Sequence, residues 1–115
     1  PYNGGTTTLQ AMWMGVPVIT LEGKNFVSRM GSSFLQAAGY QEWIARNPEE
    51  YLAIATAMVA DIQNIRQSRE SLRKNMVESR LSNPDKYSQN FEDLLQRMWR
   101  HYCNNNSEQH LIAIN

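Results

Sequence analysis

A glycine- and threonine-rich stretch near the start of the chain, YNGGTTT, combines residue types that bind an anion. Gly4 and Gly5 have no side chains, so their backbone N–H groups can approach a phosphate closely. Thr6, Thr7 and Thr8 add hydroxyl donors at the start of an expected helix, whose N-terminus carries roughly half a positive charge. These features suit a phosphate or pyrophosphate, and the alternative is an ordinary capped helix start. Neither GxxxxGK nor GxGxxG is present, so the turn alone does not name a ligand.

The expected secondary structure places this turn before a short helix and a buried strand. Leu9, Met12 and Trp13 repeat at helical spacing after a threonine cap, and Gly15 marks the end of the helix. The apolar, β-branched run VPVITL predicts one short strand near residues 16–21, buried on both faces.

The rest of the chain reads as helices with clear start signals. A helix is expected over residues 28–38, with Ser28 as its cap and Gly39 as its stop. NPEE from Asn47 predicts a capped helix start, and NPD from Asn83 repeats the signal for a long amphipathic helix whose apolar stripe is expected to be core. Residues 63–79 are polar and basic, and they read as a solvated continuation of the preceding helix or as a second helix.

A strand that is buried on both faces requires neighbouring strands beside it and helices over each face. Only one helix precedes the strand here. The pattern therefore predicts the C-terminal end of an α/β domain whose earlier strands are absent, with this stretch itself mainly α-helical.

Composition excludes several classes of function. The 115 residues suit one domain, and 42% hydrophobic with 19% charged residues favours a globular core over disorder. The 11 Lys and Arg residues balance the 11 Asp and Glu residues, which argues against nucleic acid as a partner. No apolar run is long enough to cross a membrane. Cys103 is the only cysteine, so no internal disulfide or cysteine metal cluster can form, and a cytoplasmic location is expected.

The segment YNGGTTTLQAMWMGVPVITLEGKNFVSRMGSSFL resembles the C-terminal catalytic lobe of the O-linked N-acetylglucosamine transferase family, especially its bacterial members. The resemblance runs from Tyr2 to about His101 and includes QEWIARNPEEY and MWRHY. It implies a GT-B, Rossmann-like lobe in a protein that carries tetratricopeptide repeats upstream. Residues 1–103 then form the C-terminal part of a nucleotide-sugar-binding lobe, and residues 104–115 form a polar tail.

The resemblance also implies a site. The matching turn of the family binds the diphosphate of a UDP-sugar, which places Thr6 and Thr7 at the phosphate contacts, beside the Gly4 and Gly5 backbone. The position before the two threonines is histidine in the animal enzyme and Gly5 here. An acidic residue that contacts the ribose in the family is replaced here by Gln10, a neutral hydrogen-bonding side chain.

Arg29 is the one cation of SRMGSS, the segment that matches the family after the strand. Its two interpretations are a contact with phosphate or substrate and a structural ion pair. The family's catalytic histidines and diphosphate-facing lysine lie upstream of the turn, so no catalytic residue is expected in this chain.

The function implied is therefore that of a UDP-sugar-dependent glycosyltransferase that transfers N-acetylglucosamine to Ser or Thr of proteins. The expected partners are the nucleotide-sugar donor, a protein acceptor, and the upstream catalytic half and repeat domain of the same chain. No metal or other cofactor is expected, and the isolated fragment is expected to be inactive. The alternative is a non-catalytic helical module that binds a protein, with the basic run RQSRESLRK contacting an acidic partner.

Overall fold

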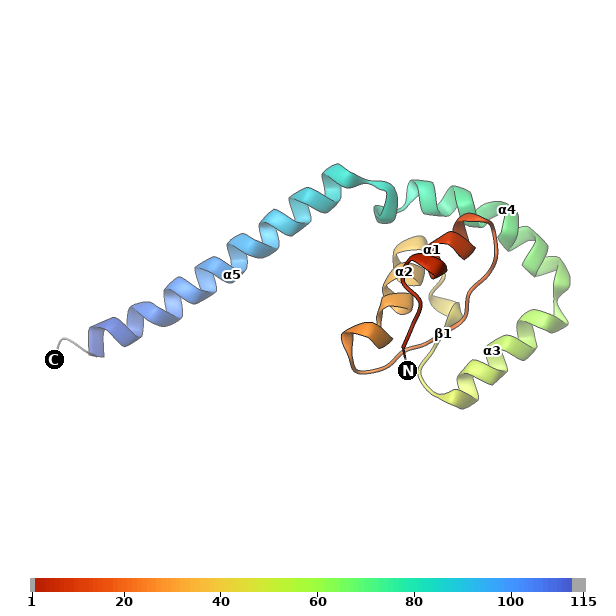
Figure 1. Ribbon diagram of the computed structural model, residues 1–115, viewed down its shortest axis with the longest axis horizontal. Helices are drawn as coiled ribbons and strands as arrows, with labels where there is room; N and C mark the ends of the chain where they lie inside the picture. The colour runs from red at the N-terminus through yellow and green to blue at the C-terminus, as the bar shows by residue number, and fades with distance from the viewer. Residues whose placement is uncertain (1, 113–115) are drawn as a thin grey trace. The chain divides into compact units, whose positions relative to one another are not determined.

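The computed structural model describes residues 2–112, with side chains as far as Asn105 (Figure 1). The chain divides into one unit that ends at Asn83 and another that begins at Pro84. The elements of the first unit are α1 (Thr6–Trp13), β1 (Thr20–Leu21), η1 (Phe26–Ser28), α2 (Met30–Ala38), η2 (Gln41–Trp43), β2 (Ile44–Ala45), α3 (Pro48–Ala60), α4 (Ile62–Glu78) and η3 (Arg80–Ser82), where η denotes a 3₁₀ helix. The second unit is helix α5 (Pro84–Ile112). The prediction of a mainly helical chain is confirmed.

The sheet of the first unit has two short parallel strands. Thr20 in β1 pairs with Ile44 in β2, Leu21 pairs with Ala45, and α2 lies in the connection between the strands (Figure 1). The strand expected over residues 16–21 is present only at its last two positions. Val16 is 47% exposed, because a sheet of two strands cannot cover both faces of the segment that leads into it. The second strand was not predicted, since two residues are too few to show a periodic pattern.

The core of this unit lies where α1, α2 and α4 meet. Met12, Leu35 and Leu72 are fully buried, one from each helix. Beside them, the rings of Tyr40 and Trp43 stack with centroids 4.2 Å apart. The core therefore fixes α1, and with it the glycine–threonine turn, against the rest of the unit.

The start of α3 follows the prediction closely. The Asn47 side chain accepts a hydrogen bond from the Glu50 N–H at 2.7 Å, and Pro48 occupies the first helical position. The Glu50 carboxylate accepts in turn from the Arg46 backbone N–H at 2.8 Å. These two bonds satisfy donors that a helix start otherwise leaves unpaired.

We expect Asn47→Ala to destabilise the first turn of α3 by about 1 kcal/mol, because the alanine cannot accept the Glu50 N–H. Native-state amide hydrogen exchange in the natural full-length protein measures this local opening. The control is Asn47→Ser, which keeps a cap acceptor. Equal losses in the two variants would show that the cap bond does not stabilise the helix.

One helix start differs from expectation, and one open alternative is decided. A helix was predicted over 28–38 with Ser28 as cap, but the structure has η1 up to Ser28 and then α2. The Ser28 hydroxyl instead donates to the Asn25 carbonyl at 2.8 Å and accepts from the Asn25 N–H at 3.1 Å. Gly39 ends α2 with φ of 86°, as predicted. Residues 63–78 belong to a separate helix, α4, as one of the two interpretations expected; the side chain of Asp61 caps its start, and Ser79 follows its end.

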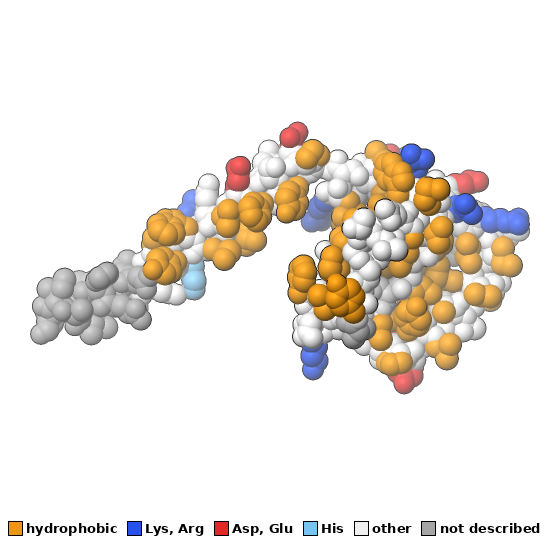
Figure 2. Space-filling model, in the orientation of Figure 1, with side chains coloured by type: hydrophobic (Ala, Val, Ile, Leu, Met, Phe, Trp, Pro, Cys, Tyr) orange, Lys and Arg blue, Asp and Glu red, His pale blue; other side chains and the backbone are white. Residues whose placement is uncertain are grey.

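Helix α5 extends beyond the boundary expected from the sequence. Residues 104–112, expected as part of a polar tail, continue the helix, and residues 113–115 lie outside the described part. Figure 2 shows hydrophobic side chains along this helix, and all of them from Tyr87 to Tyr102 are at least 48% exposed. A single helix cannot bury its own apolar stripe, so the expectation that these residues form a core is not met within α5.

Candidate functional site

The glycine–threonine turn forms the N-terminus of α1. The helix begins at Thr6, with Gly5 as the residue before it and no side-chain cap. The prediction of a threonine cap is wrong, because the Thr8 hydroxyl donates instead to the Gly4 carbonyl at 2.9 Å. Within residues 2–112, no acceptor is found for the backbone N–H groups of Thr6 and Thr7, and both side chains are exposed. The turn thus presents two unpaired N–H groups and two hydroxyls at the positive end of a helix.

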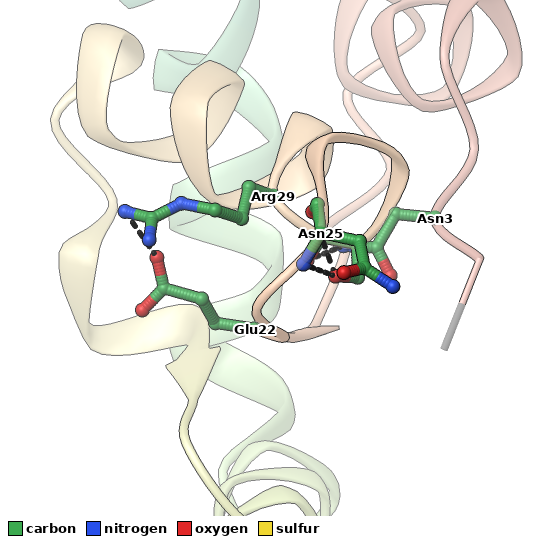
Figure 3. Close-up of polar contacts among 5 residues, drawn as sticks. Asn3, Glu22, Asn25 and Arg29 are labelled. Atoms are coloured by element: carbon green, nitrogen blue, oxygen red, sulfur yellow. Dashed lines mark hydrogen bonds and ion pairs between the residues drawn. The ribbon is translucent and has the colours of Figure 1, made fainter.

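The chain just before the turn is tied to a loop distant in sequence. The Asn3 backbone N–H donates to the Val27 carbonyl at 3.0 Å, and its side-chain amide donates to the Ser28 carbonyl at 2.8 Å. Figure 3 shows Asn3 beside the loop that contains Asn25. Two hydrogen bonds between Asn25 and Ser28 close this loop. The sequence indicated Ser28 only as a helix cap and did not predict its contact with Asn3. Their bonds hold the turn in place relative to the start of α2.

Close packing around the turn requires small residues. A Cβ on Gly4 would lie 2.8 Å from the Thr8 hydroxyl oxygen, and a Cβ on Gly5 would lie 3.1 Å from the terminal methyl of Met30. A Cβ on Gly31, in α2, would collide with the Thr20 side chain. The glycines therefore let α1, β1 and α2 approach one another where the turn is formed.

Gln10, the predicted ribose contact, lies one helical turn beyond Thr6. Both residues line a hollow of about 500 Å³, together with apolar side chains that include Trp13 and Met76. Gln10 is exposed, and its side-chain amide has no hydrogen-bond partner among the described residues, while its backbone carbonyl accepts from the Met14 N–H at 3.0 Å. The structure thus brings two of the predicted contacts to one face of α1, as their spacing of four residues requires.

Arg29 lies on a different side of this region. Its guanidinium approaches the Glu22 carboxylate at 3.3 Å, and Figure 3 shows it directed toward Glu22 and away from Asn3. The structure therefore shows the ion pair that was one of its two interpretations. Contact between Arg29 and a phosphate stays a prediction, and it would require the arginine to leave Glu22.

Other kinds of site were sought in the same residues. No group of three or more His, Cys, Asp or Glu side chains that could hold a metal ion is found within the described part. Cys103 is half-buried on α5. None of the helices in residues 2–112 has both the length and the apolar character needed to cross a bilayer.

Comparison with known proteins gives consistent matches over most of the chain. The profile of Glycosyl transferase family 41 matches residues 2–91. A Petunia hybrida protein named "Probable UDP-N-acetylglucosamine--peptide N-acetylglucosaminyltransferase SPINDLY" is 37% identical over 103 residues, which are 90% of this chain and 11% of the petunia protein. A Caenorhabditis elegans UDP-N-acetylglucosamine--peptide N-acetylglucosaminyltransferase is 32% identical over 100 residues, 87% of this chain and 9% of that protein.

A solved structure also resembles the chain. It is a mutant of the Thermobaculum terrenum O-GlcNAc transferase, with a TM-score of 0.76 and 42% sequence identity. The match covers 91% of this chain and 20% of that protein. The two chains therefore share the fold of this region, and this chain spans only a small part of its relatives.

Proposed function

This chain belongs to glycosyl transferase family 41, and we propose that it forms the C-terminal part of an enzyme that transfers N-acetylglucosamine from UDP to Ser or Thr hydroxyls of proteins. In this proposal the turn from Gly4 to Thr7 binds the diphosphate of the donor. The upstream catalytic half, the repeat domain, the absence of a metal requirement and the cytoplasmic location belong to the same proposal.

The observation that carries the proposal is the start of α1. The unpaired N–H groups of Thr6 and Thr7 and their exposed hydroxyls point to a ligand with several acceptor oxygens. During transfer, the acceptor hydroxyl attacks the anomeric carbon and UDP departs, so negative charge develops on the diphosphate. Donors fixed in advance by Asn3 and by the helix stabilise this charge without reorganisation.

The most direct test of the function is a transfer assay with the natural full-length protein. We expect labelled N-acetylglucosamine to pass from UDP-N-acetylglucosamine to protein hydroxyls, with UDP as the second product. UDP-glucose and GDP-fucose serve as competing donors. Transfer from GDP-fucose alone would overturn both the proposed sugar and the proposed nucleotide.

Gln10 provides a second test, because its side chain lies one turn from Thr6 on the same face. We expect Gln10→Ala to weaken UDP binding by roughly fivefold, the loss of about one neutral hydrogen bond. Isothermal titration of the full-length protein with UDP measures the change. The control is Gln36→Ala, an exposed glutamine on α2. An unchanged affinity for Gln10→Ala would remove this residue from the nucleotide site.

A further inference from the structure

A second hollow, of about 520 Å³, lies on the other side of Trp13 from Gln10. It is lined by Trp13, Met14 and the Gly15 turn of α1 and by Arg66, Arg69, Glu70 and Arg73 of α4. The three arginines are spaced three and four residues apart, so they share one face of the helix. Figure 2 shows Lys and Arg side chains gathered where Figure 1 places α4.

The positive charge of this face has no ion-pair partner among the described residues. No carboxylate lies within ion-pair distance of Arg66, Arg69 or Arg73 in the part of the chain that the structure describes. Glu70 lines the same hollow, so three positive charges face one negative charge. Because the whole chain has a formal net charge of zero, this imbalance is a local feature. Such a surface attracts an anionic partner.

Two large apolar side chains line part of the hollow. The Arg73 guanidinium lies 4.6 Å from the centroid of the Trp13 ring, a cation–π contact. Trp13 and Met14 are 39% and 68% exposed. The Arg69 side chain and carbonyl approach Gly15 so closely that a Cβ there would lie 2.7 Å from both. Arginine side chains thus lie beside two apolar side chains, and one of the arginines stacks on Trp13. This combination suits a ligand with both carboxylates and an apolar side chain.

We infer that this hollow, which we call the arginine hollow, binds an acidic segment of a partner protein. Carboxylates of the segment pair with Arg66, Arg69 and Arg73, and an apolar side chain of the segment rests on Trp13 and Met14. Arg66 and Arg73 are seven positions apart, about 10 Å along the helix, which is the length of roughly three extended residues.

A peptide fits the observations better than a membrane or a nucleic acid. The arginines line a hollow beside Trp13 and Met14, and a single side chain can enter it more readily than a flat lipid surface can. The zero net charge of the chain argues against a nucleic-acid partner. Trp13 and Met14 line both this hollow and that of Thr6 and Gln10, but the three arginines line only this one. Loss of UDP binding and loss of peptide binding are therefore measured with different ligands and different variants.

The test uses the natural full-length protein and a fluorescent peptide of alternating Asp and Glu with one central Leu, followed by anisotropy. We expect binding that weakens as salt is raised, and about a tenfold higher Kd for Arg66→Glu combined with Arg73→Glu. Arg66→Gln removes one charge at an exposed residue and should give a smaller loss without disturbing the Trp13 contact. Lys24→Glu, an exposed loop residue outside the hollow, is the matched control and should bind normally.

Two further binding measurements identify the class of partner. UDP should not displace the peptide, and vesicles containing phosphatidylserine should not bind more tightly than neutral vesicles. The inference is overturned if the wild-type protein does not bind the acidic peptide, if the arginine variants bind it as well as wild type does, or if binding is to anionic vesicles instead.

Discussion

Replacing both Thr6 and Thr7 by alanine in the natural full-length protein is expected to lower kcat/KM for transfer from UDP-N-acetylglucosamine by roughly 100-fold. The substitutions remove the two exposed hydroxyls at the start of α1 but leave the backbone N–H groups in place. Donors that meet charge as it develops on the departing diphosphate affect the transition state more than the ground state. We therefore expect most of the loss in kcat and a smaller change in KM.

The structure provides controls for this double substitution. Thr56→Ala makes the same chemical change on α3, where the hydroxyl only donates to the Leu52 carbonyl at 2.8 Å. It should leave transfer unchanged. Thr6→Ser combined with Thr7→Ser keeps both hydroxyls and should retain most of the activity. If the alanine variant transfers sugar at the wild-type rate, these hydroxyls do not contact the donor.

Gly15→Ala is expected to destabilise the packing of α1 on α4 by about 3 kcal/mol. Gly15 has φ of 73°, in the left-handed region that disfavours residues with a Cβ. Its Cβ would also lie 2.7 Å from the Arg69 carbonyl oxygen, which is part of the α4 backbone and cannot move alone. Amide hydrogen exchange in α1 and α4 of the full-length protein measures the change in local opening free energy.

Gly39→Ala separates the cost of the left-handed backbone conformation from the cost of the close contact with Arg69. Gly39 has φ of 86°, but a Cβ there would meet no atom within 4 Å. Its substitution should cost about 1 kcal/mol, from the backbone conformation alone. A loss for Gly15→Ala no larger than that for Gly39→Ala would show that the contact with Arg69 adds nothing, and it would contradict the packing described for α1 and α4.

Features that depend on a few neighbouring residues could be predicted from the sequence. Asn47, Pro48 and Glu50 form a helix start because their bonds close within four residues. Gly15 and Gly39 end helices because each supplies a positive φ where the chain must turn. The turn at Gly4 could also be singled out from neighbouring residues, because glycines directly precede the start of a helix there.

Features that depend on distant residues could not be predicted. Asn3 bonds to Ser28 across 25 positions, and no local pattern marks either residue for that contact. Thr6, Thr7 and Thr8 were all candidates for the helix cap. The Thr8 hydroxyl donates instead to the Gly4 carbonyl, and this bond depends on the backbone path before the helix. The two residues of β2 form a strand only because β1 lies beside them.

The central claim is that the start of α1 binds the diphosphate of a nucleotide sugar. Its most direct test is hydrogen exchange of the Thr6 and Thr7 amides in the full-length protein, with and without saturating UDP. Both amides lack an acceptor in the described structure, so they should exchange rapidly without ligand and become strongly protected when diphosphate oxygens accept their N–H groups. Unchanged exchange at these amides, while titration shows that UDP is bound, would contradict the claim and place the nucleotide elsewhere.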